Sequence, residues 1–360
     1  MKTFFVYSFI FSTFLCCIFS CKPKTTEQTQ SPVVDSLPAV QVATALPVDS
    51  LSASFLAKLP LLDSKIWQSK ARFTGSFHQD SAMQVIFGKN CFRFACDYFG
   101  NEDDTKTLFM GIWKTENYPA KTFASLWEEN QDTFPNPRNK INDTRANGDS
   151  IFEIGTKKYA ILSTSTLSSS FPEFSRTGRF QAAFLGIALF EQKNIDNILF
   201  WELQFYTPAI GLYGSYSTAP SPTYYLFGKK EIVLAIQQSN GGAGGPFYSQ
   251  VYLHKLSNTS PLLLEEHFIA RFYEQDGKGE WKTELSFAEM TDQEFPNLVL
   301  TTKGNFSKNS FTKSEENIET IGFPKSLEEK IKQQDDFDFT LIRTYQIQDN
   351  KYSLVGEVLE

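Results

Sequence analysis

The sequence predicts a mainly β protein, an antiparallel meander with a few short helices. Aromatic residues make up 15% of its 360 residues, including 35 Phe and 14 Tyr. Such side chains favour strands where they alternate with polar residues. An α+β fold is the alternative. The alternating segments are, in chain order, AMQVIFG, FRFACDYF, TLFMGIW, YAILSTS, FWELQFY, YYLFG, EIVLAIQQS, SQVYLHKL and HFIARFY.

The N-terminus is typical of a secretory signal peptide. Lys2 supplies a positive charge, and residues 4–19 form an almost unbroken apolar run. As a helix this run covers about 24 Å, which is shorter than the ~30 Å hydrocarbon core of a bilayer. Pro23 between two lysines then ends the segment. A charged start, a short apolar core and a small residue before the break predict an export signal.

The end of this segment resembles the lipobox of bacterial lipoproteins. Ile18, Ser20 and Cys21 fit that motif, whereas Phe19 is bulkier than the motif prefers. The resemblance covers only the first 21 residues. It implies that residues 1–20 are removed and that Cys21 becomes an N-terminus carrying acyl chains such as palmitate, which anchor it in a membrane. An ordinary cleaved signal and an uncleaved anchor are the alternatives.

The composition of residues 21–50 predicts a lipidated cysteine followed by a disordered tether. The 29 residues after Cys21 contain four prolines and no aromatic residue. Such a segment cannot bury enough apolar surface to offset the entropy lost on ordering. As a flexible coil it would span roughly 30 Å. The folded body is therefore expected over residues 51–360, as one large β domain or as two divided near 140–150.

A few helices and one hairpin are expected within the body. Helical spacing occurs in LSASFLAKL (51–59) and YPAKTFASLWEENQ (118–131), and SLEEKIKQQ (326–334) begins with Ser326 and Glu329 in a capping-box arrangement. The C-terminal segment FTLIRTYQIQDNKYSLVGEV reads as two strands joined by a turn at Asp349 and Asn350. Both residue types tolerate positive φ in a tight turn.

Short polar-then-aliphatic segments recur at steps of about 30 to 43 residues. This spacing is compatible with a regular meander or with a propeller-like arrangement. MTDQEFPNLVLTTKG faintly resembles the FG-GAP type of propeller repeat. That loop usually carries several calcium-binding aspartates, but here Asp292 stands alone and Asn297 precedes the aliphatic strand. No metal or other cofactor is therefore predicted.

Charge and cysteine content limit the classes of partner. Removal of Lys2 with residues 1–20 leaves 33 basic and 41 acidic side chains, a net charge of −8. This balance argues against nucleic acid and anionic lipid headgroups as main partners. Cys91 and Cys96 remain, and five steps along a strand place them about 16 Å apart on opposite faces. Two buried free thiols are expected.

No catalytic residue can be assigned from the sequence. The three histidines, His78, His254 and His267, stand in no metal or triad motif, and packing within a strand explains His254. Ser215 in GLYGSYS lacks the second glycine of a nucleophile elbow, and GGAGG leads into a strand rather than a helix. The acidic clusters NEDD, EQDGKGE and QQDDFD are interpreted as solvated turns. The sequence therefore leaves enzymatic activity open and favours a protein without it.

Tyrosines in a Gly-, Ser- and Pro-rich segment favour a recognition surface. In FWELQFYTPAIGLYGSYSTAPSPTYYLFG, the candidates are Tyr213 and Tyr216. A tyrosine offers a flat apolar body with a polar tip, which suits glycan and protein recognition. The competing interpretation is that Trp201, Phe205 and Tyr225 belong to the core and that the loop between the strands is merely long.

These observations predict a lipid-anchored protein of the bacterial cell envelope, attached to the outer membrane rather than the inner one. Its body is expected to bind a protein or a polysaccharide. The alternative is a periplasmic or surface hydrolase whose carboxylates meet only in the fold. A structural part of an assembly is a third hypothesis, for which a large exposed apolar patch would be the mark.

Overall fold

The computed structural model describes residues 46–47, 58–59, 62, 64–97, 105–114, 141–168, 182–214, 218–228, 231–241, 247–271, 281–288, 295–307 and 325–360. All of them belong to one compact unit, Ala43–Glu360. The signal segment, the lipobox, Tyr216 and the expected helix over 118–131 lie outside the described residues. No described helix combines the length and the apolar character needed to cross a membrane.

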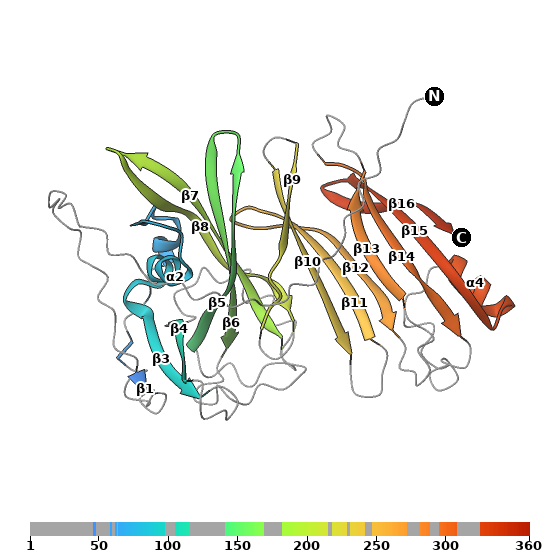
Figure 1. Ribbon diagram of the computed structural model, residues 1–360, viewed down its shortest axis with the longest axis horizontal. Coiled ribbons are helices and arrows are strands. Elements are labelled where there is room, and N and C mark those ends of the chain that lie inside the picture. The colour runs from blue at the N-terminus through green and yellow to red at the C-terminus, as the bar shows by residue number, and fades with distance from the viewer. Residues whose placement is uncertain are drawn as a thin grey trace, which may run out of the picture. The chain divides into compact units, whose positions relative to one another are not determined.

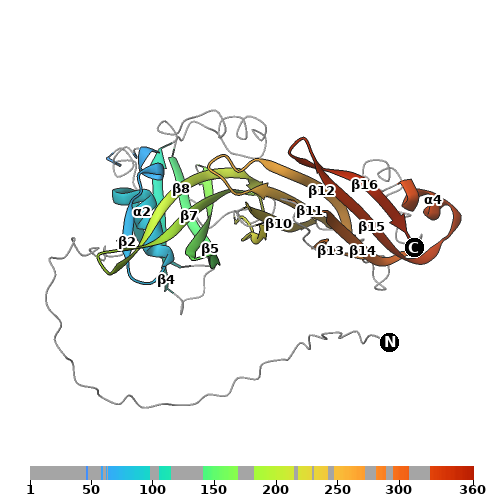
Figure 2. The same cartoon turned by 90° about the horizontal axis from the view of Figure 1, so that it is seen from above.

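The first sheet follows the order β1-β3-β4-β5-β6-β7-β8-β2. Figure 1 labels β1 and β3 to β8 of this sheet, and Figure 2 labels β2. Only the short β1 is parallel to its neighbour, and the other strands pair antiparallel. From β3 to β8 the chain order is also the spatial order. The strands are β1 Leu46–Pro47, β2 Arg72–Thr74, β3 Cys91–Asp97, β4 Thr105–Lys114, β5 Ile141–Ile154, β6 Lys157–Ser168, β7 Ala183–Ile195 and β8 Ile198–Tyr213.

Two four-stranded antiparallel meanders follow. The second sheet has the order β12-β11-β10-β9 and the third β13-β14-β15-β16. The mainly β, antiparallel meander is therefore confirmed, and the described strands form one long and two short meanders. The strands are β9 Thr223–Phe227, β10 Glu231–Gly241, β11 Phe247–Lys255, β12 Leu262–Arg271, β13 Trp281–Phe287, β14 Leu298–Ser307, β15 Asp336–Gln348 and β16 Lys351–Leu359.

The described helices are short, as expected, but one of them replaces a predicted strand. They are η2 Ser64–Gln68, α2 Gln79–Phe87, η3 Gly88–Asn90 and α4 Lys325–Gln333. The segment AMQVIFG lies in α2 rather than in a strand, so that prediction was wrong. Its buried residues Ala82, Met83, Ile86 and Phe87 recur at helical spacing. Gly88, with a φ of 53°, ends the helix at a conformation that favours glycine.

Helix α4 forms where the sequence predicted a helix, but it does not begin with the predicted cap. The helix starts at Lys325, which places Ser326 inside its first turn. The Ser326 hydroxyl donates a hydrogen bond to Glu357 on β16. Lys330 Nζ also donates to the backbone oxygen of Glu360, at 3.4 Å. Helix α4 therefore packs beside β16, and Figure 2 shows the two elements together.

Two tight turns of the same sequence type join neighbouring long strands. Asp349 and Asn350 have φ values of 50° and 64° between β15 and β16, which confirms the predicted hairpin. Asp196 and Asn197 have φ values of 51° and 65° between β7 and β8. Positive φ at both central residues gives a turn whose twist matches that of the strands. Each turn therefore fixes the register of its hairpin.

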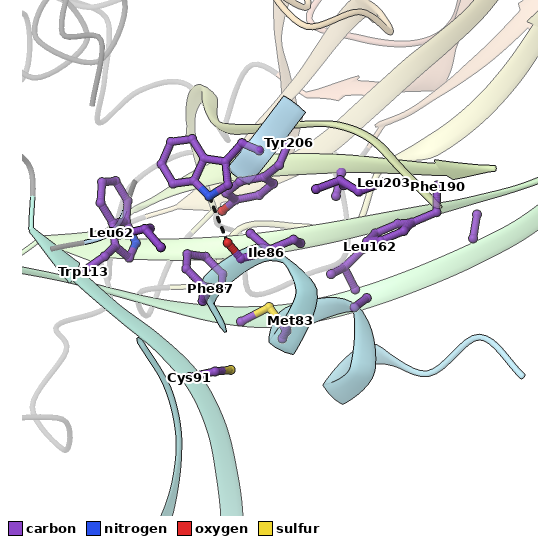
Figure 3. Packing of buried hydrophobic residues seen from close by; sticks show 14 of the residues in the cluster. Leu62, Met83, Ile86, Phe87, Cys91, Trp113, Leu162, Phe190, Leu203 and Tyr206 are labelled. Carbon is purple, nitrogen blue, oxygen red and sulfur yellow. Dashed lines mark hydrogen bonds between the residues drawn. The ribbon is translucent and has the colours of Figure 1, made fainter. Parts of the chain in front are cut away.

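Helix α2 covers one face of the first sheet and forms a core with it. Figure 3 shows Met83, Ile86 and Phe87 of the helix among Leu162 and Tyr206 of the strands. The Trp67 indole N–H donates to the backbone oxygen of Ile86 at 3.1 Å. Gly111 on β4 is required here, because a Cβ at that position would collide with the ring of Phe87.

The second sheet is covered on both faces. On β10, Ile232, Leu234 and Ile236 pack with residues of the first sheet, while Val233 and Ala235 pack with residues of the third. Alternate side chains of a strand point to opposite faces, so a strand that is buried on both sides must be apolar throughout. This explains the continuous run IVLAI within β10.

Candidate functional site: a charged cluster beside an apolar hairpin tip

The turn between β7 and β8 carries a group of exposed aliphatic side chains. Residues 194–199, called the hairpin tip below, are all exposed. Ile195, Ile198 and Leu199 have 38–48% of their surface accessible to solvent. Ile195 and Ile198 are directly opposite each other across the turn. Ile195 and Ile198 therefore share one face of the hairpin, and Leu199, the next residue of β8, points to the other face at the same end of the first sheet.

Two buried carboxylates lie behind the hairpin tip. Glu191 on β7 and Glu202 on β8 are register partners, and both are buried. The Cβ atoms of directly opposite residues are about 4.5–5.5 Å apart, so two like charges at such positions repel each other. Trp201 and Leu203, which flank Glu202, point into the core beneath α2. The carboxylates therefore lie on the face opposite that core.

Three cations compensate the two carboxylates. Lys157 Nζ lies 3.2 Å from Glu191 Oε1, and Lys193 Nζ lies 2.7 Å from Glu191 Oε2. Arg72 Nη2 lies 2.9 Å from Glu202 Oε2. These five residues, called the charged cluster below, come from four adjacent strands, β6, β7, β8 and β2. Their formal charges sum to +1, so the charged cluster retains one positive charge after its internal pairing.

Gln204 extends the charged cluster toward the solvent. Its amide nitrogen donates to Glu202 Oε1 at 3.2 Å, and its amide oxygen accepts a hydrogen bond of 2.6 Å from Lys70 Nζ. Lys70 thereby adds a further cation at the edge of the same surface. The contacts Lys157–Glu191, Arg72–Glu202 and Lys70–Gln204 join different strands or the loop before β2, whereas Lys193–Glu191 and Gln204–Glu202 join residues two apart on one strand. The register of the sheet therefore determines which cations reach the two carboxylates from neighbouring strands.

The electrostatics of the charged cluster favour the ionised state of Glu191. Burial alone would raise the pKa of this carboxyl, but the hydrogen bonds and charges of Lys193 and Lys157 outweigh burial and lower it. The same contact raises the pKa of Lys157. A general acid at neutral pH needs a carboxyl whose pKa is raised. Glu191 is thus suited to holding cations in place rather than to donating a proton.

Asp143 on β5 has the opposite electrostatic environment. Burial raises the pKa of its carboxyl, and the charge of Arg145 only partly offsets this effect. Arg145 Nη2 lies 3.5 Å from Asp143 Oδ2, and Asp143 Oδ1 has no hydrogen-bond partner among the described residues. Thr144, which precedes Arg145, points to the other face, where it accepts a hydrogen bond from the Trp113 indole. Asp143 is thus a buried carboxyl separate from the charged cluster.

Tyr213, a predicted ligand-binding residue, is buried against the second sheet. Its hydroxyl lies 2.5 Å from His254 Nε2, and His254 Nδ1 lies 2.8 Å from the Ser260 carbonyl oxygen. Because a carbonyl can only accept, Nδ1 carries the proton, and Nε2 accepts from the Tyr213 hydroxyl. The ring of Tyr213 also meets Tyr252 edge-on at 4.7 Å. Tyr213 and His254 therefore hold β8 and β11 together, as packing was expected to explain for His254.

Of the other positions that the sequence singled out, some lie in the core and the rest lie outside the described residues. Cys91 is a buried free thiol, as predicted, and burial raises its pKa well above the ordinary value. The side chain of Cys96 lies outside the described residues, as do Cys21 and Tyr216. Trp201 is buried in the core, in agreement with the competing interpretation of its segment. The structure therefore brings none of the described candidates together with the charged cluster.

A small pocket lies between the first two sheets. Its volume is about 100 Å³, and its polar lining includes Ser150, Ser163 and Ser221, with Tyr224 and Leu234 beside them. A space of this size holds about three water molecules. The Ser163 hydroxyl already donates to the Gly148 carbonyl at 3.1 Å. Within the described part of the chain, no three His, Cys, Asp or Glu side chains are grouped so as to hold a metal ion.

Strand β16 carries a second group of exposed aliphatic side chains. It is the last strand of the third sheet, and β15 is its paired neighbour. Leu354, Val355 and Val358 have 44–55% of their surface accessible to solvent. A bulge interrupts the pairing at Val355, between the partners of Thr344 and Tyr345. β16 is thus an apolar edge strand with a local irregularity.

The sequence contains a local signal for part of the charged cluster. Asp196-Asn197 is typical of a two-residue turn, and such a turn sets the register of the hairpin. That register places Glu191 directly opposite Glu202. The cationic partners Lys157 and Arg72 come from β6 and β2, whose pairing with this hairpin has no comparable local signal.

Comparison of the chain with protein-family models, with curated proteins and with solved structures finds no match.

Proposed function

We propose that this protein is a lipid-anchored protein of the bacterial cell envelope whose folded body is an interaction module for another protein. The lipobox-like residues ending at Cys21 and the proline-rich segment after them support the anchor and the tether. The exposed aliphatic edge of β16 is the single observation that supports binding. Lipid on Cys21 would hold the body at the envelope, where a membrane-bound or envelope partner can reach β16.

The chemistry of β16 favours a polypeptide over a polysaccharide. An edge strand presents backbone N–H and C=O groups that can pair with another extended chain. Leu354, Val355 and Val358 add apolar surface that can bury side chains of such a chain. Edge strands are often protected by charged or proline residues. Here the centre of the strand, Leu354-Val355-Gly356, carries neither a charge nor a proline, and the bulge at Val355 is the one protective feature that these three residues show.

Affinity purification from native membranes tests this proposal. The tagged full-length chain is compared with a variant carrying Leu354→Glu and Val358→Glu. A matched control carries Ile198→Glu and Leu199→Glu, which alters residues of similar exposure in the first sheet. A partner protein should be enriched at least tenfold by the parent and the control, and lost with the β16 variant. Reciprocal capture with the partner tagged should recover this chain.

The same preparation tests the anchor. Mass spectrometry of the mature N-terminus should show acyl chains on Cys21 and no residues 1–20. A mature chain that begins elsewhere and carries no acyl group would contradict the anchor. Equal partner recovery by all three chains would contradict a role for β16. A captured polysaccharide without a protein would replace the proposed partner class.

The alternative of a hydrolase gains no support from the buried carboxylate pair. Glu191 and Glu202 are opposite each other, but Lys157, Lys193 and Arg72 neutralise them. A glycosidase-type mechanism needs one protonated carboxyl and one ionised carboxyl beside a substrate cleft. The lowered pKa of Glu191 opposes the first of these roles. The hydrolase hypothesis stays a prediction that would need a different pair.

A further inference from the structure

We infer that the hairpin tip, with the charged cluster behind it, is a membrane-contact element that rests on the phospholipid headgroups. Ile195, Ile198 and Leu199 would enter the interface, and Lys157 and Lys193 would bind lipid phosphates. This inference goes beyond the proposed protein partner and concerns a different sheet. It rests on the proposed lipid anchor only for keeping the body close to the bilayer.

The spacing of apolar and cationic residues matches the layers of a bilayer interface. Lys193 precedes Ile195 by two residues, and a strand rises about 3.3 Å per residue, so the two Cα atoms are about 7 Å apart. Continuation of the pairing between Tyr159 and Glu191 places Lys157 level with Lys193. Apolar groups of interfacial segments enter about 5–10 Å into the boundary between headgroups and acyl chains. The lysines would therefore lie at the depth of the phosphates.

The net positive charge of this surface favours binding of an anionic phosphate group over binding of a cation. The charged cluster carries a net +1, Lys70 at its edge adds one positive charge, and the exposed Asp196 of the hairpin tip adds one negative charge. The net charge of the tip and the cluster together therefore stays at +1. The Lys157 side chain is largely exposed, and the Lys193 and Arg72 side chains are partly exposed. Glu191 and Glu202 are buried, so the cations are the groups that solvent or a ligand meets first. Long lysine side chains can also extend their ammonium groups along an interface while their stems stay apolar.

The form of the hairpin tip favours a fluid surface over a protein pocket as its partner. A two-residue turn with positive φ at Asp196 and Asn197 makes the tip narrow and projecting. A lipid headgroup layer accommodates such a projection without a preformed cavity, whereas a protein partner must supply one. The acidity of the whole chain does not oppose this contact, because charges farther away than about 10 Å are screened by salt.

A single tip of this size would bind a membrane weakly by itself. The acyl chains on Cys21 would raise its effective concentration at the bilayer, because the 24 residues between Cys21 and β1 would span only roughly 27 Å as a coil. The contact would then orient the body rather than hold it at the membrane. Removal of the tip's apolar groups should therefore change the position of the first sheet relative to lipid, and not the amount of membrane-bound protein.

Fluorescence quenching of the full-length chain in vesicles tests this inference. Leu199→Cys carries an environment-sensitive NBD label, and the matched control Leu354→Cys carries the same label on β16. Leu354 has a similar exposure and lies in the third sheet, and the described native thiol, Cys91, is buried. The unsubstituted chain, treated with the same reagent, gives the background. Vesicles contain phosphatidylethanolamine and phosphatidylglycerol, with or without nitroxide-labelled lipid.

The label at position 199 should become at least twice as bright in vesicles and should be quenched by nitroxide lipid. The label at position 354 should change little. Adding Ile198→Ser to the Leu199→Cys chain should reduce the quenching. A net charge of +1 predicts about fivefold weaker contact when phosphatidylcholine replaces phosphatidylglycerol. Equal quenching at both positions, or none at position 199, would overturn the inference.

The outcomes separate this inference from the proposed function. Unacylated Cys21, found by mass spectrometry, contradicts the anchor alone, and the label at position 199 must then still be quenched when millimolar lipid is added. An acylated chain whose label at position 199 stays unquenched contradicts the membrane contact alone. Brightening of that label by envelope proteins without lipid would assign the hairpin tip to a protein partner and overturn the membrane contact.

Discussion

At the scale of single residues, Glu191 shows how a buried charge can be retained on a sheet. Desolvation disfavours its ionised form, and so does the opposite Glu202. Two lysine ammonium groups within 3.2 Å outweigh both effects, because the pKa of Glu191 is lowered. The carboxylate in turn fixes two flexible lysine side chains beside the hairpin tip. The contribution of Glu191 to the free energy of unfolding must therefore depend on pH.

Replacement of Glu191 by glutamine should destabilise the protein at neutral pH but not in acid. A carboxyl whose folded-state pKa is depressed contributes stability above its unfolded pKa of about 4.3, and this contribution is lost as pH falls through the folded-state pKa. The lysines are partly exposed, so solvent screening limits the loss at pH 7 to about 1 kcal/mol. Urea unfolding of the parent and of Glu191→Gln at pH 7, 5 and 3 measures this loss in the free energy of unfolding.

The matched control for this prediction is Glu153→Gln. Glu153 lies on β5 in the same sheet and is exposed. Its replacement should change the free energy of unfolding by less than about 0.5 kcal/mol at each pH. If Glu191→Gln lowered stability equally at pH 3 and pH 7, packing of the side chain rather than its charge would account for the loss.

Residue identity alone could not reveal the position of Tyr213. The Gly-, Ser- and Pro-rich surroundings favoured an exposed tyrosine, whereas the ring is buried against His254 and Tyr252. Both partners lie on β11, some 40 residues along the chain, and no local pattern indicates that the two sheets meet there. The opposite case is Cys91, whose burial follows directly from its place in an alternating strand.

At the scale of elements, periodicity identified most strands but not the helix α2. Eight of the nine alternating segments lie largely in β3, β4, β6, β8, β9, β10, β11 and β12. The ninth, AMQVIFG, is short and almost entirely apolar, so strand and helix patterns fit it equally well. Its buried residues pack into the face of the first sheet lined by Trp113 and Tyr206. Tertiary packing therefore decided the type of this element.

The two Asp-Asn turns provide a prediction at the element scale. Asn350→Ala should lower the free energy of unfolding by about 1 kcal/mol, because alanine disfavours the left-handed conformation that this position adopts. Asn197→Ala should have a similar effect in the other hairpin. Asn350→Gly should be neutral or slightly favourable, since glycine adopts positive φ without steric cost. Urea unfolding of the three variants measures these differences.

The glycine variant separates backbone strain from lost side-chain contacts. Both substitutions at Asn350 remove the same amide group, and only alanine introduces strain at a φ of 64°. Equal losses with alanine and glycine would show that the amide, rather than the backbone conformation, stabilises the turn. The Asp349-Asn350 turn was predicted from the sequence because its strands alternate clearly on both sides.

At the scale of the whole molecule, the second sheet links two cores. Leu234 packs with the first sheet and Val233 with the third, although they are neighbours on β10. The apolar run of β10 indicates burial on both faces, but it cannot indicate which sheets cover them. That information lies in contacts between residues about 50 to 110 positions apart, such as Val233 with Leu298 and Tyr345.

Unfolding of the two cores should therefore be coupled. Val233→Ala removes two methyl groups from the core shared with the third sheet, which should cost about 2 kcal/mol. Trp67, Trp113 and Trp201 all lie in the core beneath α2, which Val233 does not touch. Their fluorescence, recorded in a background with Trp127→Phe and Trp281→Phe, reports on that distant core. The urea midpoint from fluorescence should fall as much as the midpoint from far-UV circular dichroism.

Leu234→Ala is the companion variant, because its side chain faces the core between the first and second sheets. It should also lower both midpoints together, which corresponds to a loss of about 3 kcal/mol in the free energy of unfolding. If Val233→Ala left the tryptophan transition in place while the circular dichroism transition split in two, the first sheet would unfold independently of the other two. Equal shifts of the two urea midpoints would mean that a cavity on one face of β10 destabilises the cores on both faces. The reason is that the second sheet cannot lose one covering layer without exposing apolar residues.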